Sequence, residues 1–378
     1  MTRHISREAY DYIATQEQLS RLDHLVGPYD TIALDTEADS LHNYEGKTCL
    51  MQLTFGDHNF IVDTLAALDL SDFFKIIESK DLILHGSDYD LRMLFITFGF
   101  RPQGRVFDTL LAAQLLGHER LGLAALAEHY CGVTMSKTGQ KTDWSQRPLT
   151  EHQLRYACDD TRYLIAIAHD LKKELEAQGR LAWHAEMCER VVRSTGIIKI
   201  EDKENKWRIK GSSKLDRLHL AYLKALWQWR EEEARKANRP PFKIMNNEPL
   251  INFVVHLSTT KEDIQYPHYI NGERLRTLKE TIQTVKRMSE KDYPPKKEKK
   301  PFKDFSRTRD NVRVDAVRDA CKAIATNLKI APSLIASRAM IEKVVTSNAT
   351  SHDDLMAIEG MMSWQATLLV EALGKVHR

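Results

Sequence analysis

Short apolar runs bounded by turn residues mark the first hundred positions of the chain. They predict buried strands over Thr31–Asp35, Cys49–Phe55 and Asn59–Asp63. The Gly56-Asp57 pair between the second and third runs predicts a hairpin turn. A fourth strand is predicted over Leu82–His85.

The spacing of apolar residues changes near Asp88, where a period of three to four residues begins. This period predicts a helix over Asp88–Phe98 that ends at Gly99, and mostly helical structure over Thr109–Ala177. Strands thus come first along the chain and helices follow, with an initial antiparallel hairpin. This order predicts an α/β domain over residues 1–195, built on a mixed sheet that helices flank.

Two small all-α units are predicted beyond this domain. In the first, over 212–290, apolar residues three and four apart form one stripe along a helix: Leu215, Leu218, Tyr222, Leu226 and Trp229. Pro240-Pro241 ends that helix. The stretch Lys291–Lys303 holds six lysines, two acids and three prolines, so a Lys/Pro-rich solvated linker is predicted over 291–306. The second helical unit is predicted over 307–378.

Charge is distributed unevenly along the chain, although its 378 residues carry a formal net charge of only +2. Residues 1–195 hold 20 basic and 29 acidic side chains, whereas residues 196–303 hold 25 basic and 15 acidic ones. An acidic first half followed by a basic middle predicts that part of the molecule contacts a polyanion.

Cysteine usage and hydropathy narrow the class of protein. The five cysteines form no CxxC pair and are odd in number, which argues against a disulfide framework and a structural zinc site. No apolar run approaches the roughly 18 residues of a membrane-spanning helix. Residues 1–19 also lack the apolar core of a secretory signal. We therefore predict a cytoplasmic protein without a membrane partner.

Two acids lie at the end of the first predicted strand. Asp35 and Glu37 are two positions apart, so their side chains project from the same face of the strand. Paired carboxylates in such a place are unfavourable unless a cation or hydrogen-bond donors compensate them. The alternative is an ordinary solvent-exposed strand end, since such triplets occur by chance in most proteins.

Further acids follow on two predicted helices. Asp88 is predicted to cap the helix that follows Leu82–His85. Asp90 then lies in the first turn, where the alternative to a site residue is an acid that complements the helix dipole. Tyr156 and Asp160 are four positions apart and share one face of a helix whose neighbouring positions are mostly apolar.

These elements together supply four carboxylates, which is what two hard divalent cations require. Oxygen ligands suit Mg²⁺ or Mn²⁺ and not zinc. Two such cations can clamp the attacking and leaving oxygens of phosphodiester cleavage. We therefore predict a nuclease whose cofactors are two divalent metal ions, Mg²⁺ or Mn²⁺, in each active site.

The set Asp35-x-Glu37, Asp90 and Tyr156-x3-Asp160 resembles the four acids and tyrosine of DEDD-type 3′→5′ exonucleases of the tyrosine subtype. Over most of residues 5–190 the chain is similar to the ribonuclease D family, in six stretches that keep their order: Ile32–Glu37, Cys49–Leu53, His85–Leu91, Phe107–Thr109, Thr142–Leu149 and Tyr156–Leu164. The shared order and separations make the joint match far more specific than any single triplet.

The resemblance implies a ribonuclease H-like exonuclease fold and a metal-dependent 3′→5′ exoribonuclease. Such an enzyme trims RNA 3′ ends and releases nucleoside 5′-monophosphates, and precursor tRNA is the substrate class that the family suggests. The resemblance also implies that Asp35 bridges both cations and that Glu37 and Asp160 complete the first metal site. Asp90 is implied to serve the second site, and Tyr156 to orient the attacking water.

Residues that precede the predicted catalytic helix offer contacts to RNA. Trp144 stacks on a base in one interpretation and packs in the core in the other. Arg147 either contacts a phosphate or pairs with an acid. His85 is predicted to be a hydrogen-bonded residue at a strand end and not a metal ligand. Gly46-Lys-Thr48 is not a phosphate-binding loop, because Leu41 stands where its first glycine is required, so no nucleoside triphosphate is expected.

The unit over 212–290 resembles the HRDC domain, an accessory domain shared by RecQ-type helicases and ribonuclease D, in stretches that include Arg239–Ile244. The unit over 307–378 looks like a second, more diverged copy. Basic side chains near Phe242 are predicted to bind the RNA backbone, with a solvated helix end as the alternative: Arg235, Lys236, Arg239 and Lys243. Trp229 is predicted to pack in the core.

Two other functions are compatible with these residues. A DNA 3′→5′ exonuclease uses the same four acids and tyrosine, but the HRDC-like units disfavour it. A non-catalytic RNA-binding scaffold is disfavoured because all five catalytic positions hold competent residues. Single-stranded RNA 3′ ends, with tRNA precursors as the expected class, are therefore the predicted partner.

Overall fold

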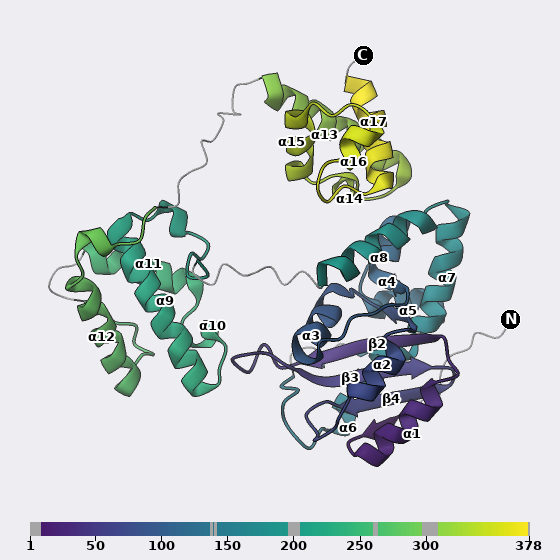
Figure 1. Cartoon of the computed structure of the whole chain (residues 1–378), viewed down its shortest axis with the longest axis horizontal. Coiled ribbons are helices and arrows are strands. Elements are labelled where there is room, and N and C mark those ends of the chain that lie inside the picture. The colour runs from purple at the N-terminus through teal and green to yellow at the C-terminus, as the bar shows by residue number, and fades with distance from the viewer. Residues whose placement is uncertain are drawn as a thin grey trace. The chain divides into compact units, whose positions relative to one another are not determined.

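Figure 1 presents the computed structural model of the chain, which describes residues 9–136, 139, 142–195, 205–259, 264–296 and 309–376. The chain divides into two compact units. The first contains Met1–Ala38, Thr48–Gly196 and Phe302–Arg378, and the second contains Asp39–Lys47 and Ile197–Pro301. Each unit therefore combines separate stretches of sequence. Of the predicted linker, positions 297–306 lie outside the described residues.

The first unit is built on a six-stranded sheet. In spatial order its strands are β1 (Asp11–Ile13), β4 (His58–Asp63), β3 (Thr48–Phe55), β2 (Thr31–Ala38), β5 (Asp81–Leu84) and β6 (Val106–Asp108). β3 pairs antiparallel with β2 and β4, and the other pairs are parallel. The mixed sheet and its hairpin are confirmed. The sequence pattern does not predict β1 and β6, because three residues are too few to display a period of two.

Eight helices accompany this sheet in the described part of the chain before position 196. They are α1 (Gln16–Val26), α2 (Ser71–Ile77), α3 (Asp88–Phe98), α4 (Thr109–Leu116), α5 (Leu123–Cys131), α6 (Glu151–Arg162), α7 (Leu164–Ala177) and α8 (Leu181–Thr195). Helices cover both faces of the sheet (Figure 1). α1, α2 and α3 share a hydrophobic core with strand residues such as Leu34 and Leu53. α6 and α7 pack on the opposite face, against Leu50 and Ala33 respectively.

The C-terminal helices belong to the first unit as well. They are α13 (Arg309–Leu328), α14 (Pro332–Ile335), α15 (Arg338–Ser347), α16 (His352–Met356) and α17 (Ser363–Val376). The indole ring of Trp364 stacks on that of Trp183 in α8, with centroids 4.9 Å apart and planes at 12°. The Ser363 N–H donates to the Glu186 carboxylate at 2.7 Å. These contacts hold α17 against α8, an association that the sequence pattern does not predict.

The second unit is helical, as its sequence predicts. Its helices are α9 (Arg217–Ala237), α10 (Pro241–Ile244), α11 (Asn247–Thr259) and α12 (Gly272–Lys286). α9 ends where Asn238 adopts the left-handed conformation, two residues before Pro240. Trp229 is 5% exposed and its indole N–H donates to the Thr277 hydroxyl at 3.0 Å, so its place in the core is confirmed. Among the helices that the structure describes, none is both long and apolar enough to span a bilayer.

Candidate active site

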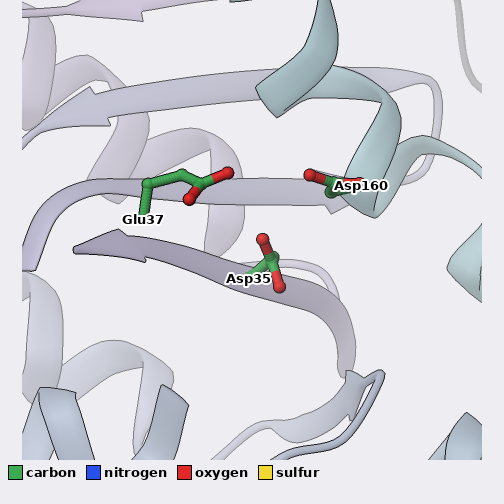
Figure 2. Close-up of side chains that lie close together, drawn as sticks. All are labelled: Asp35, Glu37 and Asp160. Carbon is green, nitrogen blue, oxygen red and sulfur yellow. The ribbon is translucent and has the colours of Figure 1, made fainter. Parts of the chain in front are cut away.

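Three carboxylates converge where the end of β2 meets α6 (Figure 2). Asp35 and Glu37 project from the same face of β2, as the alternation of strand side chains requires. Asp160 reaches them from α6. One ligand oxygen of each carboxylate lies within 4.8 Å of the other two. Oxygen ligands gathered in this way fit a divalent cation such as Mg²⁺ or Mn²⁺.

α6 begins at a capping box that sets the position of its site residues. The Thr150 hydroxyl accepts the N–H of Gln153 at 3.3 Å, and the Gln153 side chain accepts the N–H of Thr150 at 2.8 Å. Tyr156 and Asp160 then lie one turn apart on the face that packs on the sheet. The Tyr156 hydroxyl donates a hydrogen bond to the Asp160 carboxylate.

Close packing holds the ring of Tyr156 in place. The ring of Trp144 lies beside it, with centroids 6.1 Å apart. The backbone of Gly139 also lies against it, since a Cβ atom at position 139 would come within 2.3 Å of Cγ of Tyr156. A larger residue at position 139 would therefore displace the phenol from its place beside Asp160.

The fourth acid, Asp90, lies in the first turn of α3 and is 6% exposed. Its Oδ1 accepts both the N–H of Thr36 at 3.2 Å and the Thr36 hydroxyl at 2.6 Å. The turn before α3 is held by Asp108, which accepts the N–H groups of Gly86 at 3.0 Å and Ser87 at 2.7 Å. Asp90 is not part of the cluster of three carboxylates, but it lines the same cavity.

The beginning of α3 differs from the prediction by one residue. Ser87 occupies the N-cap position, and Asp88 is the first helical residue. The Asp88 side chain is 64% exposed and lies 3.7 Å from Arg92, one turn further along. Asp88 therefore faces solvent and does not cap the helix. The predicted end of α3 is confirmed, because Gly99 follows Phe98 with a positive φ of 72°.

Burial and mutual repulsion raise the pKa values of the clustered acids. The pKa of Asp35 is raised well above its ordinary value by burial first, and then by the charges of the other three acids. Burial and the neighbouring carboxylates raise the pKa of Glu37 to about 9 and that of Asp160 to about 8. Burial raises the pKa of Asp90 to about 7, although the hydrogen bonds from Thr36 oppose this increase. A bound cation would remove the repulsion that causes these shifts.

A cavity of about 670 Å³ opens over these groups. Its lining includes the four acids, Tyr156, Tyr89, His85 and Arg120. The Nδ1 atom of His85 lies 3.0 Å from the Thr109 hydroxyl, which agrees with the predicted hydrogen-bonded residue at a strand end. Burial lowers the pKa of His85, which favours its neutral form. A cavity of this size lies within the range of sites that hold small ligands.

Two residues predicted as candidates for RNA contact have other roles. Trp144 is 1% exposed, so neither face of its ring is open to a base. Arg147 donates two hydrogen bonds to Asp63, at 2.7 and 2.6 Å, and others to the carbonyl oxygens of Trp144 at 2.8 Å and Cys49 at 3.1 Å. The burial of Trp144 therefore argues against base stacking, and the pairing of Arg147 with Asp63 argues against phosphate binding. Trp144 instead packs in the core, and Arg147 pairs with an acid, which were the alternative interpretations of these residues.

The basic residues predicted to bind RNA lie in the second unit, at the end of α9, in α10 and in the segment between these helices. Arg235 lies over the ring of Tyr44 at 5.3 Å. Lys236 pairs with two neighbouring glutamates at 3.4 and 3.6 Å. The other two basic side chains, Arg239 and Lys243, are exposed, and so is the ring of Phe242.

Several residues that shape the site do not stand out in the sequence. Thr36 lies between Asp35 and Glu37, and Asp108 lies in the stretch Phe107–Thr109, which resembles the ribonuclease D family. No sequence pattern indicates the hydrogen bonds of either residue. Gln52 is fully buried beside the site and looks in the sequence like an ordinary strand residue. Gly139 lies in a non-repetitive segment, where no periodicity predicts its contact with Tyr156.

Comparison with known proteins agrees with this geometry. A family model described as "3'-5' exonuclease" matches residues 10–176, and a model of the HRDC domain matches residues 219–278. The ribonuclease H-like sheet, its carboxylate cluster and the matching family model define residues 10–176 as a 3′→5′ exonuclease domain.

Whole-chain relatives narrow the class further. Ribonuclease D of Zymomonas mobilis is 30% identical over 328 residues, covering 84% of this chain and 82% of the relative. Ribonuclease D of Escherichia coli K12 is 28% identical over 379 residues, covering 96% and 97%. The crystal structure of Escherichia coli RNase D matches with a TM-score of 0.71 and 26% identity, over 97% of this chain and 98% of that one. The chain belongs to the ribonuclease D family and is a 3′→5′ exoribonuclease.

Proposed function

We propose that this exoribonuclease hydrolyses single-stranded RNA from the 3′ end with two divalent cations, and that it releases nucleoside 5′-monophosphates. The observation that carries the proposal is the convergence of Asp35, Glu37 and Asp160 within 4.8 Å of one another. Three partly buried carboxylates so close together repel one another, and a cation is the group that relieves this repulsion. Asp90 lines the same cavity and supplies the fourth carboxylate.

Each acid has its own task in this proposal. Asp35 would contribute to both metal sites, and Glu37 and Asp160 would complete the first of them. Asp90 serves the second, held by its two hydrogen bonds from Thr36. When bound, the cations lower the pKa of the attacking water and stabilise charge on the attacking and leaving oxygens.

Tyr156 orients the attacking water in this proposal. Burial first, and then the nearby carboxylates, raise the pKa of its hydroxyl above the ordinary value for tyrosine. The phenol therefore keeps its proton at neutral pH and acts as a hydrogen-bond donor and acceptor. A group in this state positions a water and does not remove its proton.

The second unit holds the phosphate backbone of the substrate, which we propose to be precursor tRNA. Arg239 and Lys243 are exposed together with Phe242, and cations beside an aromatic ring suit single-stranded RNA. The related Escherichia coli enzyme is described as an exoribonuclease involved in structured RNA processing, which supports a structured RNA as substrate. Alanine at both Arg239 and Lys243 should weaken RNA binding and reduce its dependence on salt.

The catalytic proposal is tested by digesting RNA labelled at either end, in Mg²⁺ and in Mn²⁺. The Asp35→Asn/Asp160→Asn double variant should lose on the order of 10³-fold in rate, since it cannot hold the cations. Asp88→Asn is the control, because it makes the same Asp-to-Asn change at an exposed acid of α3 and should keep the wild-type rate. Equal trimming by the double variant and the wild type would show that the assigned site is wrong.

The same digestion tests the substrate and the product. RNA labelled at its 3′ end should release a labelled nucleoside 5′-monophosphate at once, while RNA labelled at its 5′ end should shorten step by step. Precursor tRNA should lose its 3′ extension. Faster loss of DNA than of RNA of the same sequence would overturn RNA as the preferred substrate. The cytoplasmic location stays a prediction.

A further inference from the structure

Gln52 lies in the middle of β3, and its amide group has no hydrogen-bond partner among the described residues. Its side chain is fully buried, with an exposure of 0%. Neither Nε2 nor Oε1 bonds to any group in the part of the chain that the structure describes. A buried primary amide with both ends unpaired is rare, because the lost hydrogen bonds to water are not replaced. An apolar residue of similar size would suit a purely structural position better.

The partner of Gln52 across the sheet is Asp35. The two residues face each other in the antiparallel register of β2 and β3, so their side chains project from the same face. That face is covered by α6, which carries Tyr156 and Asp160. The next residue on this face, Leu50, packs in the same core cluster as Tyr156. The amide of Gln52 is therefore enclosed beside the carboxylate cluster and not in a separate part of the core.

We propose that Gln52 is a positioning residue for Asp35, and that its amide hydrogen-bonds to the Asp35 carboxylate when divalent cations occupy the site. This inference rests on the proposed metal site. The amide N–H donates to the carboxylate and fixes its orientation, which is the usual role of a hydrogen-bond partner outside the ligands themselves. Without cations, the amide of Gln52 has no hydrogen-bond partner among the residues that the structure describes.

The proposal predicts effects of opposite sign on stability and on metal binding. Gln52→Leu removes the unpaired amide and keeps most of the volume, so in EDTA the full-length variant should melt a few degrees above the wild type. The same variant should bind Mn²⁺ roughly 10- to 100-fold more weakly, which is the usual loss when a partner of a metal ligand is removed. Titration calorimetry without RNA measures this affinity independently of activity.

Two further variants complete the experiment. Gln52→Met tests a second apolar side chain in case Gln52→Leu packs poorly, and it should behave in the same way. Leu50→Met is the matched control, because it changes an apolar neighbour on the same strand face and should leave Mn²⁺ affinity within about twofold of wild type.

Three outcomes would overturn the proposal. Unchanged Mn²⁺ affinity in both Gln52 variants would mean that the amide does not act on Asp35. A lower melting temperature of both variants in EDTA would mean that the amide is satisfied without cations, for example by a buried water. If the wild type itself binds no Mn²⁺, the metal site of the proposed function fails as well. That outcome is distinguished from the first two by the wild-type titration alone.

Discussion

Thr36 donates two hydrogen bonds to one oxygen of Asp90, from its N–H at 3.2 Å and from its hydroxyl at 2.6 Å. This residue lies between Asp35 and Glu37 on β2, and its side chain points to the face opposite theirs. A single strand residue thus ties the acid of α3 to the strand that carries two of the other acids. The relative position of the proposed metal ligands depends on this contact.

Thr36→Val should weaken catalysis without removing an acid. Loss of the hydroxyl leaves Asp90 with one fewer hydrogen bond, so its orientation loosens and its pKa rises further. We expect the rate at limiting Mg²⁺ to fall roughly 10- to 100-fold, and the Mg²⁺ concentration for half-maximal rate to rise. Rates measured over a Mg²⁺ series test this. Thr36→Ser keeps the hydroxyl and should restore most of the activity; equal loss in both variants would contradict the proposed role.

Gly139→Ala should reduce kcat more than it changes KM. A Cβ atom at this position would come within 2.3 Å of Cγ of Tyr156, so the ring or the backbone at position 139 must shift, and we expect the phenol to lose its place beside Asp160. Displacement by about 1 Å can lower a rate by up to roughly 100-fold. Steady-state kinetics on a short RNA measures the effect. Gly374→Ala in α17, where a Cβ atom meets nothing within 4 Å, is the control and should leave kcat unchanged. A wild-type kcat in Gly139→Ala would contradict the contact.

The sequence predicts the elements of this site better than it predicts their support. Apolar runs and turn residues locate β2, β3 and β4, and helical spacing brings Tyr156 and Asp160 together. These features depend on local periodicity, which the sequence displays directly. The joint spacing of the acids is specific enough to indicate a family, because several weak signals occur in one order.

Contacts between distant elements are not predicted in this way. Trp144 and Arg147 are of residue types that often bind RNA. In the structure, however, Trp144 is buried in the core and Arg147 pairs with the buried Asp63. The stacking of Trp183 on Trp364 joins residues far apart in the chain, and neither residue has a local pattern that indicates it. Such contacts depend on tertiary packing, which has no signature in a short window of sequence.

The metal-free enzyme should lose stability as the pH rises. The pKa values of Asp90, Asp160 and Glu37 are raised to about 7, 8 and 9, above the ordinary values of 3.8 and 4.5. These acids bind protons more tightly in the folded state, so their contribution is fully present below about pH 4 and is lost as the pH passes through 7 to 9. In EDTA the melting temperature should therefore fall across this range.

Asp160→Asn isolates this effect from the other titrating groups. The variant removes one of the repelling charges, so its melting temperature in EDTA should exceed that of the wild type by an amount that grows with pH. Mg²⁺ should stabilise the wild type most at high pH, because the ligands must be deprotonated to bind it. Scanning fluorimetry over a pH series measures all three curves. A difference between variant and wild type that does not depend on pH would contradict the assigned pKa shifts.

Arg147→Ala should destabilise the fold and leave RNA binding unchanged. Its side chain is 26% exposed, and its guanidinium makes two hydrogen bonds to Asp63, whose side chain is 8% exposed. Burial raises the pKa of Asp63, but the hydrogen bonds from Arg147 and Tyr12 outweigh this and lower it. Removing the arginine leaves a buried carboxylate without its cation, at a cost of roughly 3 kcal/mol in the free energy of unfolding.

Urea unfolding and a salt series of RNA affinities separate these two roles of Arg147. The slope of log affinity against log salt should match the wild type, because no phosphate contact is lost. Arg155→Ala is the control, since this arginine pairs with Glu151 at an exposed position and should cost about 0.5 kcal/mol or less. A reduced salt slope in Arg147→Ala would restore the phosphate-binding interpretation.

Trp364→Ala should loosen the C-terminal helices from α8 without unfolding them. Trp364 belongs to a hydrophobic cluster with residues of α4, α5 and α7, whereas the interior of the C-terminal helices has its own core around Leu369. Truncating a buried tryptophan costs about 3–5 kcal/mol where the site cannot collapse. Part of that cost is recovered here if the helices separate and water enters.

Amide hydrogen exchange distinguishes separation of these helices from their unfolding. In Trp364→Ala, exchange should accelerate in α8 near Trp183 and at the start of α17, while the middle of α13 keeps its protection. Leu369→Ala is the contrasting variant, because it removes a fully buried side chain from the core of the C-terminal helices and should accelerate exchange in α13 itself. Equal acceleration in α13 in both variants would mean that the C-terminal helices depend on Trp364 for their own folding and not only for their docking on α8.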